Sequence, residues 1–398
     1  MASGGFSETR LVRLRQALAA HVAAGDMPGV VALASRGDEV VVEAIGAQSF
    51  GGTPMKRDTI FRIASMTKPV IAAATLLLVE EGKLRLDDPV DPLLPELADR
   101  KVLKSLDSEI GDTVPARRAI TTRDLLTFTW GMGALMVWPP KYPIQKAAAE
   151  LGLMAAPSPP EFDADEYMRR LGTLPLSYQP GERWLYHTGS DVLGVLIARA
   201  SGKPLEAFLQ ERLFAPLGMR DTGFHVPAAK LDRLPSVYMM DQSKKELTFF
   251  DDARASRWSK PPAFASGGGG LVSTVDDFHA FYRMLLNKGR HGRERILARP
   301  TIELMTSDQL TESQKQGTEL FFGHGASWGL GGSVVTRRTD VFTTPGRFGW
   351  DGGCGTSAYL DPAERLIGIL MTQRMMDSPV PPKVYRDFWT SAYQAIDD

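Results

Sequence analysis

Phe61-Arg-Ile-Ala-Ser-Met-Thr-Lys68 contains the one Ser-x-x-Lys of this chain, which starts at Ser65 and ends at Lys68. In a helix, residues three apart share a face, so the hydroxyl and the amine would be neighbours. The apolar run 70–79 that follows, closed by Gly82, predicts a buried helix with a glycine C-cap. About one such motif is expected by chance in a chain of this length, so the motif gains weight only from its setting.

The predicted helix places the serine where nucleophilic catalysis needs it. Ser65 would lie at the helix N-terminus, where free backbone N–H groups can receive a developing oxyanion. A serine hydroxyl alone is a poor nucleophile, so Lys68 must be neutral to take its proton, which requires burial or a polar partner. The motif therefore predicts a serine nucleophile with a lysine base.

Composition excludes several classes of protein. The 398 residues are 43% hydrophobic and 23% charged, which is typical of a globular chain with one large or two medium domains. The net charge of -1 and the lack of a Lys/Arg run predict no nucleic-acid partner. Without a secretory signal or a membrane-spanning run, we expect a cytoplasmic protein with no membrane partner. The lone Cys354 excludes an internal disulfide and a cysteine-based metal site.

The order of elements predicts an α/β fold. Residues 29–46 read as two β-rich runs joined by a hairpin at Arg36-Gly-Asp38, after an amphipathic helix at roughly 7–24. Near the other end, strand-like segments precede a last amphipathic helix: 327–337, 356–361, 366–374 and then 384–395. Two strands need partners, so we expect a central antiparallel sheet flanked by helices from both termini.

The middle of the chain predicts a second domain. Roughly residues 86–285 carry mostly helical periodicity, broken by proline-rich connections. We therefore expect a discontinuous α/β domain, 1–85 with 286–398, a mostly helical domain, 86–285, inserted into it, and an active site at their interface.

Two further segments are candidates for the site. Tyr186 follows a Pro-Gly turn and precedes a helix expected after Asp191, and a tyrosine is a usual helper for a lysine base; aromatic packing is the alternative. His187 could line the site, and Asp191 could do so or merely cap the helix. The glycine-rich stretch 348–359 runs into a strand, where backbone can approach a substrate closely; a β-bulge is the alternative.

Taken together and in this order, the three segments resemble the serine β-lactamase and penicillin-binding-protein superfamily, and most closely the family VIII carboxylesterases related to class C β-lactamases. The resemblance covers nearly the whole chain and implies a β-lactamase/transpeptidase-like fold. It makes Ser65 the nucleophile, with base and acid roles shared by Lys68 and Tyr186. The oxyanion would lie between the backbone N–H groups of Ser65 and Gly353. An acyl-enzyme would form and then be hydrolysed, without a metal or organic cofactor.

Departures from the family pattern bear on the substrate. Where these β-lactamases have Lys-Thr-Gly, this chain has Trp350-Asp351-Gly352, so the cation that would hold a substrate carboxylate is absent and a neutral, apolar group fits better. The asparagine two residues after the tyrosine is here Thr188. Phe128 and Trp130 add bulk and could line the pocket, with core packing as the alternative. The expected substrate-binding residues are Trp350, Asp351, Gly352, His187 and Trp130.

A second esterase signature is present but lacks its context. Gly325-Ala-Ser-Trp-Gly329 matches Gly-x-Ser-x-Gly, which in α/β-hydrolases needs a helix after the serine and a later histidine. None of the six histidines follows His324, and the next residues read as a strand, so we expect Ser327 to be non-catalytic. The scattered histidines form no metal-binding pair either.

These observations predict a serine carboxylesterase that acts on short-chain, neutral esters, with a small-molecule ester as its partner. A β-lactamase, a D-amino-acid amidase or an acyltransferase on the same fold stays open, because the nucleophile is common to all of them. A non-catalytic ligand-binding relative is the alternative of a different class. Its sign would be the loss of Ser65, Lys68 or Tyr186, and all three are present. The sequence does not indicate an oligomeric state.

Overall fold

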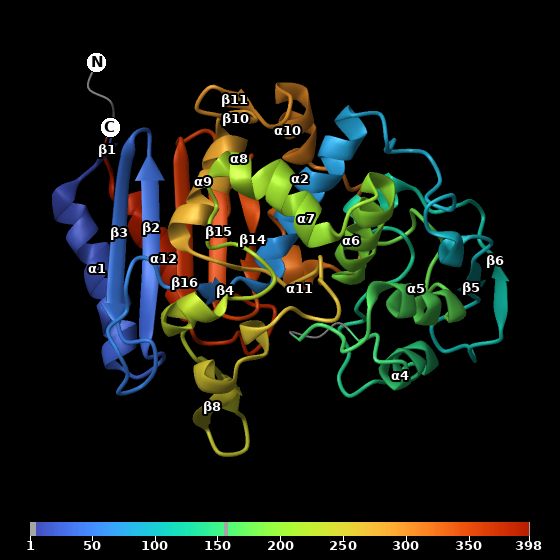
Figure 1. Cartoon of the computed structure of the whole chain (residues 1–398), viewed down its shortest axis with the longest axis horizontal. Coiled ribbons are helices and arrows are strands. Elements are labelled where there is room, and N and C mark those ends of the chain that lie inside the picture. The colour runs from blue at the N-terminus through green and yellow to red at the C-terminus, as the bar shows by residue number, and fades with distance from the viewer. Residues whose placement is uncertain (1–4, 155–157, 398) are drawn as a thin grey trace.

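Seven antiparallel strands form the central sheet of the computed structural model, which describes residues 5–154 and 158–397 (Figure 1). The spatial order brings strands from the C-terminal third beside the first hairpin: β12 (Ala326–Trp328), β13 (Ser333–Val335), β14 (Phe348–Gly352), β15 (Thr356–Asp361), β16 (Leu366–Thr372), β2 (Gly29–Arg36) and β3 (Glu39–Gly46). Arg36 pairs with Glu39, so the turn of the first hairpin is Gly37-Asp38, as predicted.

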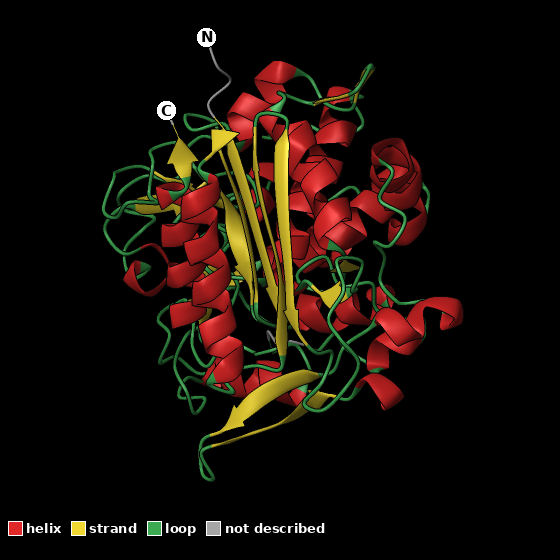
Figure 2. Ribbon diagram, turned by 90° about the vertical axis from the view of Figure 1, so that its left-hand side faces the viewer, coloured by secondary structure: helices red, strands yellow, loops and turns green. Residues whose placement is uncertain are grey.

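Both faces of the sheet are buried, as the alternation along β2 shows. Val30, Ala32 and Ala34 pack against the terminal helices α1 (Glu8–Ala23) and α12 (Lys383–Gln394). Val31 and Leu33 point to the opposite face and belong to the large core. Figure 2 shows the sheet with helices on both sides. The predicted fold class is therefore confirmed, and the two terminal helices lie within a residue of their predicted bounds.

The two ends of the chain are joined directly. A short ladder pairs β1 (Gly5–Phe6) with β17 (Ile396–Asp397). The buried His21 of α1 contacts Asp26 at 2.7 Å and Asp387 of α12 at 2.8 Å. These contacts hold the N- and C-terminal helices together on one face of the sheet.

The opposite side of the molecule is mostly helical, with α2 (Thr67–Glu80) packed against α6 (Thr188–Ser201) at its centre. The other helices are α3 (Thr122–Leu126), α4 (Pro143–Glu150), α5 (Ala164–Thr173), α7 (Leu205–Leu209), α8 (Ala215–Leu217), α9 (Val275–Leu286), α10 (Arg299–Met305) and α11 (Glu319–Phe322). Small two-stranded ladders join β4 (Phe61–Arg62) to β9 (Val272–Ser273), β5 (Lys101–Leu103) to β6 (Thr113–Pro115), β7 (Val237–Asp241) to β8 (Glu246–Asp251), and β10 (Arg290–His291) to β11 (Glu294–Arg295).

One boundary of the expected helical domain, 86–285, differs in the structure. Helix α9 packs against β15, β16 and β2, and its Tyr282 hydroxyl donates to the Ala358 carbonyl at 3.0 Å. The apolar face of α9 thus covers the sheet, so residues from about 272 onward belong with the α/β part of the fold.

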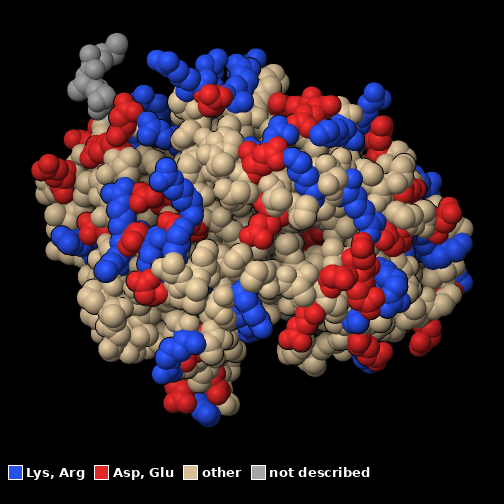
Figure 3. Space-filling view, in the orientation of Figure 1, with Lys and Arg blue, Asp and Glu red and all other residues tan. Residues whose placement is uncertain are grey.

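Charge is mixed over the face shown in Figure 3, where Lys and Arg side chains alternate with Asp and Glu. In the part of the chain that the structure describes, no helix has the length and apolarity to cross a bilayer.

Candidate active site

Ser65 lies in a single 3-10 turn, η1 (Ala64–Met66), between β4 and α2. The residue before it, Ala64, has φ of 44°, a left-handed conformation that is strained for a residue with a side chain. The turn leads directly into α2, which begins at Thr67 and carries Lys68 in its first turn. Lys68 Nζ lies 3.0 Å from Ser65 Oγ. The Ser-x-x-Lys spacing thus brings the two groups into hydrogen-bonding contact.

Lys68 is completely buried, and its environment favours the neutral amine. Burial lowers the pKa of Lys68 to about 7, an effect that the nearby Asp191 carboxylate opposes in part. Nζ donates to the Gly268 carbonyl at 2.5 Å and lies 3.3 Å from His187 Nδ1. The site therefore favours an uncharged lysine far more than water does, which is the form that could accept a proton from Ser65.

Tyr186 faces the same serine from the other side. The Trp350 indole N–H donates to the Tyr186 hydroxyl at 2.7 Å, and Lys68 Nζ lies 4.6 Å from the centre of the tyrosine ring. Burial raises the pKa of Tyr186 to about 12, although hydrogen bonding with Ser65 and Trp350 favours the phenolate. Tyr186 is therefore a neutral phenol at pH 7, suited to donating a proton.

A buried chain of polar groups supports Lys68 from behind. His187 Nε2 lies 3.4 Å from Asp191 Oδ2, and Asp191 Oδ1 accepts from the Ser266 hydroxyl at 2.7 Å and the Gly268 N–H at 2.9 Å. Burial pushes the pKa of Asp191 upward, but these partners together hold it below its ordinary value. Burial and the lysine charge lower the pKa of His187, so the imidazole is neutral. Asp191 lies inside α6, which begins at Thr188, so it organises this chain rather than capping the helix.

Two features show that this arrangement is tightly constrained. His187 has φ of 84° and ψ of -67°, a costly conformation for a residue with a side chain. At Gly268, a Cβ atom would lie 2.8 Å from His187 Nε2 and 3.0 Å from an Asp191 carboxylate oxygen. Only glycine lets this loop approach the histidine and the aspartate so closely.

Strand β14 ends beside the serine. A Cβ on Gly352 would collide with the Ile63 carbonyl and the Thr356 hydroxyl, so glycine is needed where the strand meets the segment before Ser65. Gly353 follows directly, and nothing lies within 4 Å of the position where its Cβ would be. The backbone here borders open space next to Ser65, as the expected oxyanion site between Ser65 and Gly353 requires.

A cavity of about 390 Å³ opens in front of these residues. Its walls combine the serine, the tyrosine and β14 with residues from several loops: Ser65, Met136, Tyr186, Phe321, Ala326, Ser333, Val335, Thr343, Arg347, Trp350, Asp351, Gly353, Tyr359, Met375, Met376, Ser378, Pro379 and Pro381. Segments from both expected domains contribute, including Met136 and Tyr186 from the helical part. The volume is within the usual range for small-molecule sites.

The residues at the altered Lys-Thr-Gly position have distinct roles. Trp350 lines the cavity and fixes the tyrosine hydroxyl, as described above. Asp351 also lines the cavity, accepts a 2.5 Å hydrogen bond from the Ser357 hydroxyl, and has a pKa that burial raises to about 6. Gly352 serves backbone packing. The strand therefore presents an indole and a buried carboxyl at the position where the resemblance led us to look for a cation.

The bulky residues expected near the pocket pack elsewhere. Trp130 is fully buried in the large hydrophobic core and is not among the described residues that line the cavity. We therefore correct its expected substrate contact to core packing. Phe128 is also fully buried, in an aromatic cluster where its ring centre lies 6.1 Å from that of Tyr186 and 4.9 Å from that of Trp328. Phe128 thus packs near the tyrosine ring as part of the aromatic cluster.

The second serine signature is structural. Ser327 is fully buried in β12, and its hydroxyl donates to Asp308. The next residues turn into β13, so the helix that a nucleophile elbow needs does not follow. Within residues 5–154 and 158–397, no cluster of three or more His, Cys, Asp or Glu side chains is arranged to hold a metal ion.

Several site residues were not anticipated from the sequence. Phe321 packs on Tyr186 with ring centres 5.0 Å apart and lines the cavity. Arg347 is the one cationic side chain among the described lining residues, and its guanidinium lies 3.8 Å from the Tyr359 ring centre and 4.1 Å from that of Trp389. Gly268 accepts from Lys68. Of these three residues, only Gly268 lies in a stretch that the sequence marks as unusual, the glycine run 267–270.

An antiparallel sheet with flanking helices, together with a Ser-x-x-Lys turn facing a tyrosine and a glycine-ended strand, defines the class of serine β-lactamases and penicillin-binding proteins. The chain belongs to the β-lactamase family, whose model matches residues 14–386. This confirms the resemblance, including its esterase branch, as the relatives below show.

The chain is similar to proteins that include a named esterase and a hydrolase of known structure. Esterase EstB of Burkholderia gladioli is 33% identical over 367 residues, which cover 86% of this chain and 85% of EstB. An uncharacterized protein of Mycobacterium tuberculosis is 38% identical over 366 residues, which cover 90% and 88% of the two chains. The fold matches EstCE1, a hydrolase with promiscuous acyltransferase activity, with a TM-score of 0.80 at 24% identity over 97% of this chain and 99% of that one.

Proposed function

We propose that the protein is a serine carboxylesterase that hydrolyses neutral esters through an acyl-enzyme on Ser65. The observation that carries the proposal is the 3.0 Å contact between Ser65 Oγ and Lys68 Nζ at the wall of the catalytic cavity. Burial lowers the pKa of this lysine to about 7. A nucleophile within reach of a neutral amine can be activated without a metal. The 33% identity to an esterase supports the same reaction class.

In acylation, Lys68 Nζ takes the Ser65 proton while Oγ attacks the ester carbonyl carbon. The carbonyl oxygen becomes an oxyanion between the N–H groups of Ser65 and Gly353. As the intermediate collapses, the bond to the alkoxy oxygen breaks, and Tyr186 gives its proton to the leaving alcohol. The lysine proton then passes to the phenolate, whose ring centre lies 4.6 Å from Nζ. This leaves an acyl group on Ser65 and both helpers in their starting states.

In deacylation, water takes the place of the alcohol. Lys68, again neutral, acts through Tyr186 to remove the water proton, and hydroxide attacks the acyl carbon. Ser65 Oγ leaves and regains a proton, releasing a carboxylic acid. The chain His187-Asp191-Gly268 keeps Nζ aimed at the serine in both half-reactions.

The loss of the strand cation argues against β-lactams as main substrates. Trp350 occupies the lysine position and donates its N–H to Tyr186, so it cannot neutralise a substrate carboxylate. Arg347 also lines the cavity, but its guanidinium packs on the aromatic rings of Tyr359 and Trp389, so we do not assign it the role of the missing strand lysine. Acyl transfer to an alcohol other than water is the second candidate, because Acyltransferase calJ of Penicillium decumbens is 26% identical over 91% of this chain.

The lone Cys354 is buried, and its pKa is raised by burial to about 12, so it is neither a disulfide partner nor a reactive thiol. This is consistent with the reducing cytoplasm, the compartment that we propose.

The test compares initial rates with p-nitrophenyl esters and with a chromogenic cephalosporin, for the wild type, Ser65→Ala and the matched Ser327→Ala. We expect ester hydrolysis far above cephalosporin turnover, loss of both in Ser65→Ala, and near wild-type rates in Ser327→Ala. Activity that survives Ser65→Ala rejects the nucleophile, and turnover of the cephalosporin alone rejects the substrate class. Adding a primary alcohol and measuring the new ester separates hydrolysis from acyl transfer.

A further inference from the structure

We propose that a side cavity next to the catalytic cavity binds the acyl group of the substrate, and that this group is an apolar chain of roughly six to ten carbons. The inference rests on the proposed esterase function and replaces the short acyl chains expected from the sequence.

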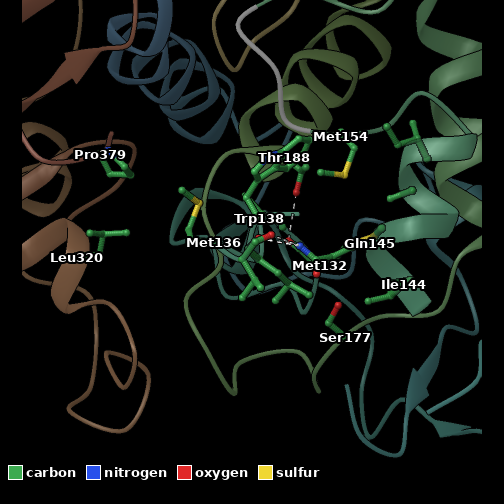
Figure 4. Close-up of a pocket in the computed structure, with 16 residues that line it drawn as sticks. Met132, Met136, Trp138, Ile144, Gln145, Met154, Ser177, Thr188, Leu320 and Pro379 are labelled. Atoms are coloured by element: carbon green, nitrogen blue, oxygen red, sulfur yellow. Dashed lines mark hydrogen bonds between the residues drawn. The ribbon is translucent and has the colours of Figure 1, made fainter. Parts of the chain in front are cut away.

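The side cavity has a volume of about 330 Å³ and lies between the loop 132–138, helix α4 and Thr188 at the start of α6 (Figure 4). At ~30 Å³ for a group of the size of water, it holds roughly ten such groups. A short acyl group such as acetyl would leave most of this space unfilled. A chain of medium length fills it.

The chemistry of the walls selects an apolar ligand. None of the described residues that line the side cavity carries a charge. The polar Gln145 side chain is already engaged, because its amide donates to the Leu135 and Val137 carbonyls at 3.0 and 3.1 Å. Thr188 Oγ1 donates to the Met132 carbonyl at 3.2 Å. The dashed lines in Figure 4 mark hydrogen bonds of Gln145 and Thr188.

Apolar side chains also mark the entrance. Trp138 is 82% exposed and lines the side cavity together with Val137, which is 39% exposed. Leu320, across the opening in Figure 4, is 45% exposed. Large apolar side chains grouped around an opening are typical of a binding site for an apolar ligand.

The side cavity adjoins the catalytic cavity. Met136 and Pro379 line both. The loop that forms the shared wall is anchored to the catalytic tyrosine, because the Ala134 N–H donates to the Tyr186 carbonyl at 2.9 Å. Our proposal places one substituent of a substrate whose carbonyl lies at Ser65 past Met136, in the side cavity.

The position of Tyr186 decides which substituent this is. Its hydroxyl must reach the alkoxy oxygen that leaves, and Tyr186 lines the catalytic cavity but not the side cavity. The alcohol therefore occupies the catalytic cavity. The acyl substituent diverges from the alcohol at the trigonal carbonyl carbon, so we place it in the adjoining side cavity.

The first arm of the test measures kcat/KM for two series of esters. One series varies the acyl group of p-nitrophenyl esters from acetate to decanoate; the other varies the alcohol of alkyl acetates from methyl to octyl. We expect kcat/KM to rise roughly two- to fourfold for each methylene added to the acyl chain up to about eight carbons, because each buried methylene contributes transfer free energy. We expect a smaller rise in the alcohol series, because the alcohol extends into the catalytic cavity, whose walls include the charged Arg347 and Asp351.

The second arm fills the side cavity. Ala148 of α4 is buried and lines it, whereas Ala149, the next residue, is exposed. We expect Ala148→Phe to lower the ratio of kcat/KM for octanoate to that for acetate at least tenfold, and Ala149→Phe to leave this ratio as in the wild type. If Ala148→Phe does not fold, Met154→Trp obstructs the same space from a partly exposed wall position.

Each outcome decides the proposal. A flat or falling acyl series, or an Ala148→Phe ratio equal to that of Ala149→Phe, overturns it while leaving the esterase function intact. A rise confined to the alcohol series assigns the cavity to the alcohol and also overturns it. If no ester of either series is hydrolysed, the proposed function itself fails, and the acyl site fails with it.

Discussion

In the proposed mechanism the chemistry depends on Lys68, because a lysine acts as a base only when it is uncharged. Its complete burial beside Gly268 and His187 achieves this at a pH where a solvated lysine is fully protonated. A carboxylate nearby, Asp191, limits the effect and keeps the pKa near 7 rather than lower.

The first prediction concerns pH. Because the reactive form is the neutral amine and the pKa of Lys68 is lowered to about 7, kcat/KM should fall about tenfold per pH unit below 7 and reach a plateau above about 8. The measurement is a pH profile from 5 to 9 with a neutral p-nitrophenyl ester. Lys68→Arg should lose at least 10³-fold in kcat/KM, since a guanidinium stays charged. A flat profile across this range would contradict the role of the lysine.

The second prediction concerns Trp350. In Trp350→Phe the aromatic packing is largely kept, but the Tyr186 hydroxyl loses its 2.7 Å donor. Since a hydrogen bond contributes about 1 kcal/mol, kcat should fall roughly three- to tenfold, with a smaller change in KM. Steady-state kinetics at pH 8 measure both. An unchanged kcat, with Tyr186→Phe inactive in parallel, would show that the indole does not position the phenol.

At this scale, the sequence could predict that Ser65 and Lys68 are neighbours, but not which residues surround them. Ser65 and Lys68 are three residues apart, so local helix geometry alone brings them together. Arg347 and Phe321 reach the cavity through loops whose path no periodicity encodes. For Trp130, bulk near the site suggested a pocket wall, whereas its full burial makes it part of the core.

At the scale of elements, the site depends on how closely strand β14 meets the turn that carries Ser65. Gly352 makes this approach possible, and Thr356 Oγ1 of the neighbouring strand donates to the Ile63 carbonyl at 3.2 Å. The backbone N–H groups of Ser65 and Gly353, the proposed oxyanion donors, are therefore fixed relative to each other by backbone packing.

The third prediction tests this junction. Gly352→Ala would force the Ile63 segment away from β14, so we expect a loss of roughly 1–3 kcal/mol in stability from overpacking and at least a tenfold fall in kcat. Gly111→Ala is the matched control, because nothing lies within 4 Å of its Cβ position and its φ is not left-handed. Thermal unfolding and kinetics of both variants give the answer. Equal behaviour of the two would mean that the close approach does not matter.

Most elements could be predicted, since the periodicities of the terminal helices, of α2 and of the first hairpin are strong. The domain boundary near 285 could not be, because α9 has the amphipathic pattern of any helix, and only tertiary packing shows that its apolar face covers the sheet. Likewise, the start of α6 at Thr188 instead of after Asp191 follows from a strained His187 that no propensity predicts.

At the scale of the whole molecule, the C-terminal helix is tied to the active-site strands. Trp389 of α12 packs on Gly368, donates its indole N–H to Ser357 at 3.0 Å, and stacks with Arg347. Ser357 in turn donates to Asp351 in the cavity wall. A helix far along the chain from Ser65 thus supports the floor of the site.

The fourth prediction compares two tryptophans. Trp389→Ala should lower the free energy of unfolding by about 3–5 kcal/mol, since it removes a large buried side chain. Trp138→Ala, at a residue that is 82% exposed, should change it by less than about 0.5 kcal/mol. Urea unfolding followed by circular dichroism measures both. A similar cost for the two would contradict the role of α12 in anchoring the sheet.

The proposal as a whole depends on one covalent bond, between an acyl group and Ser65. Rapid acid quenching during turnover of p-nitrophenyl octanoate, followed by intact-mass measurement and peptide mapping, detects that bond directly. We expect one octanoyl group per chain, on the peptide that contains Ser65, and none in Ser65→Ala. An octanoyl group on Ser327 or another residue, or hydrolysis with no acylated enzyme in a burst experiment, would contradict the mechanism.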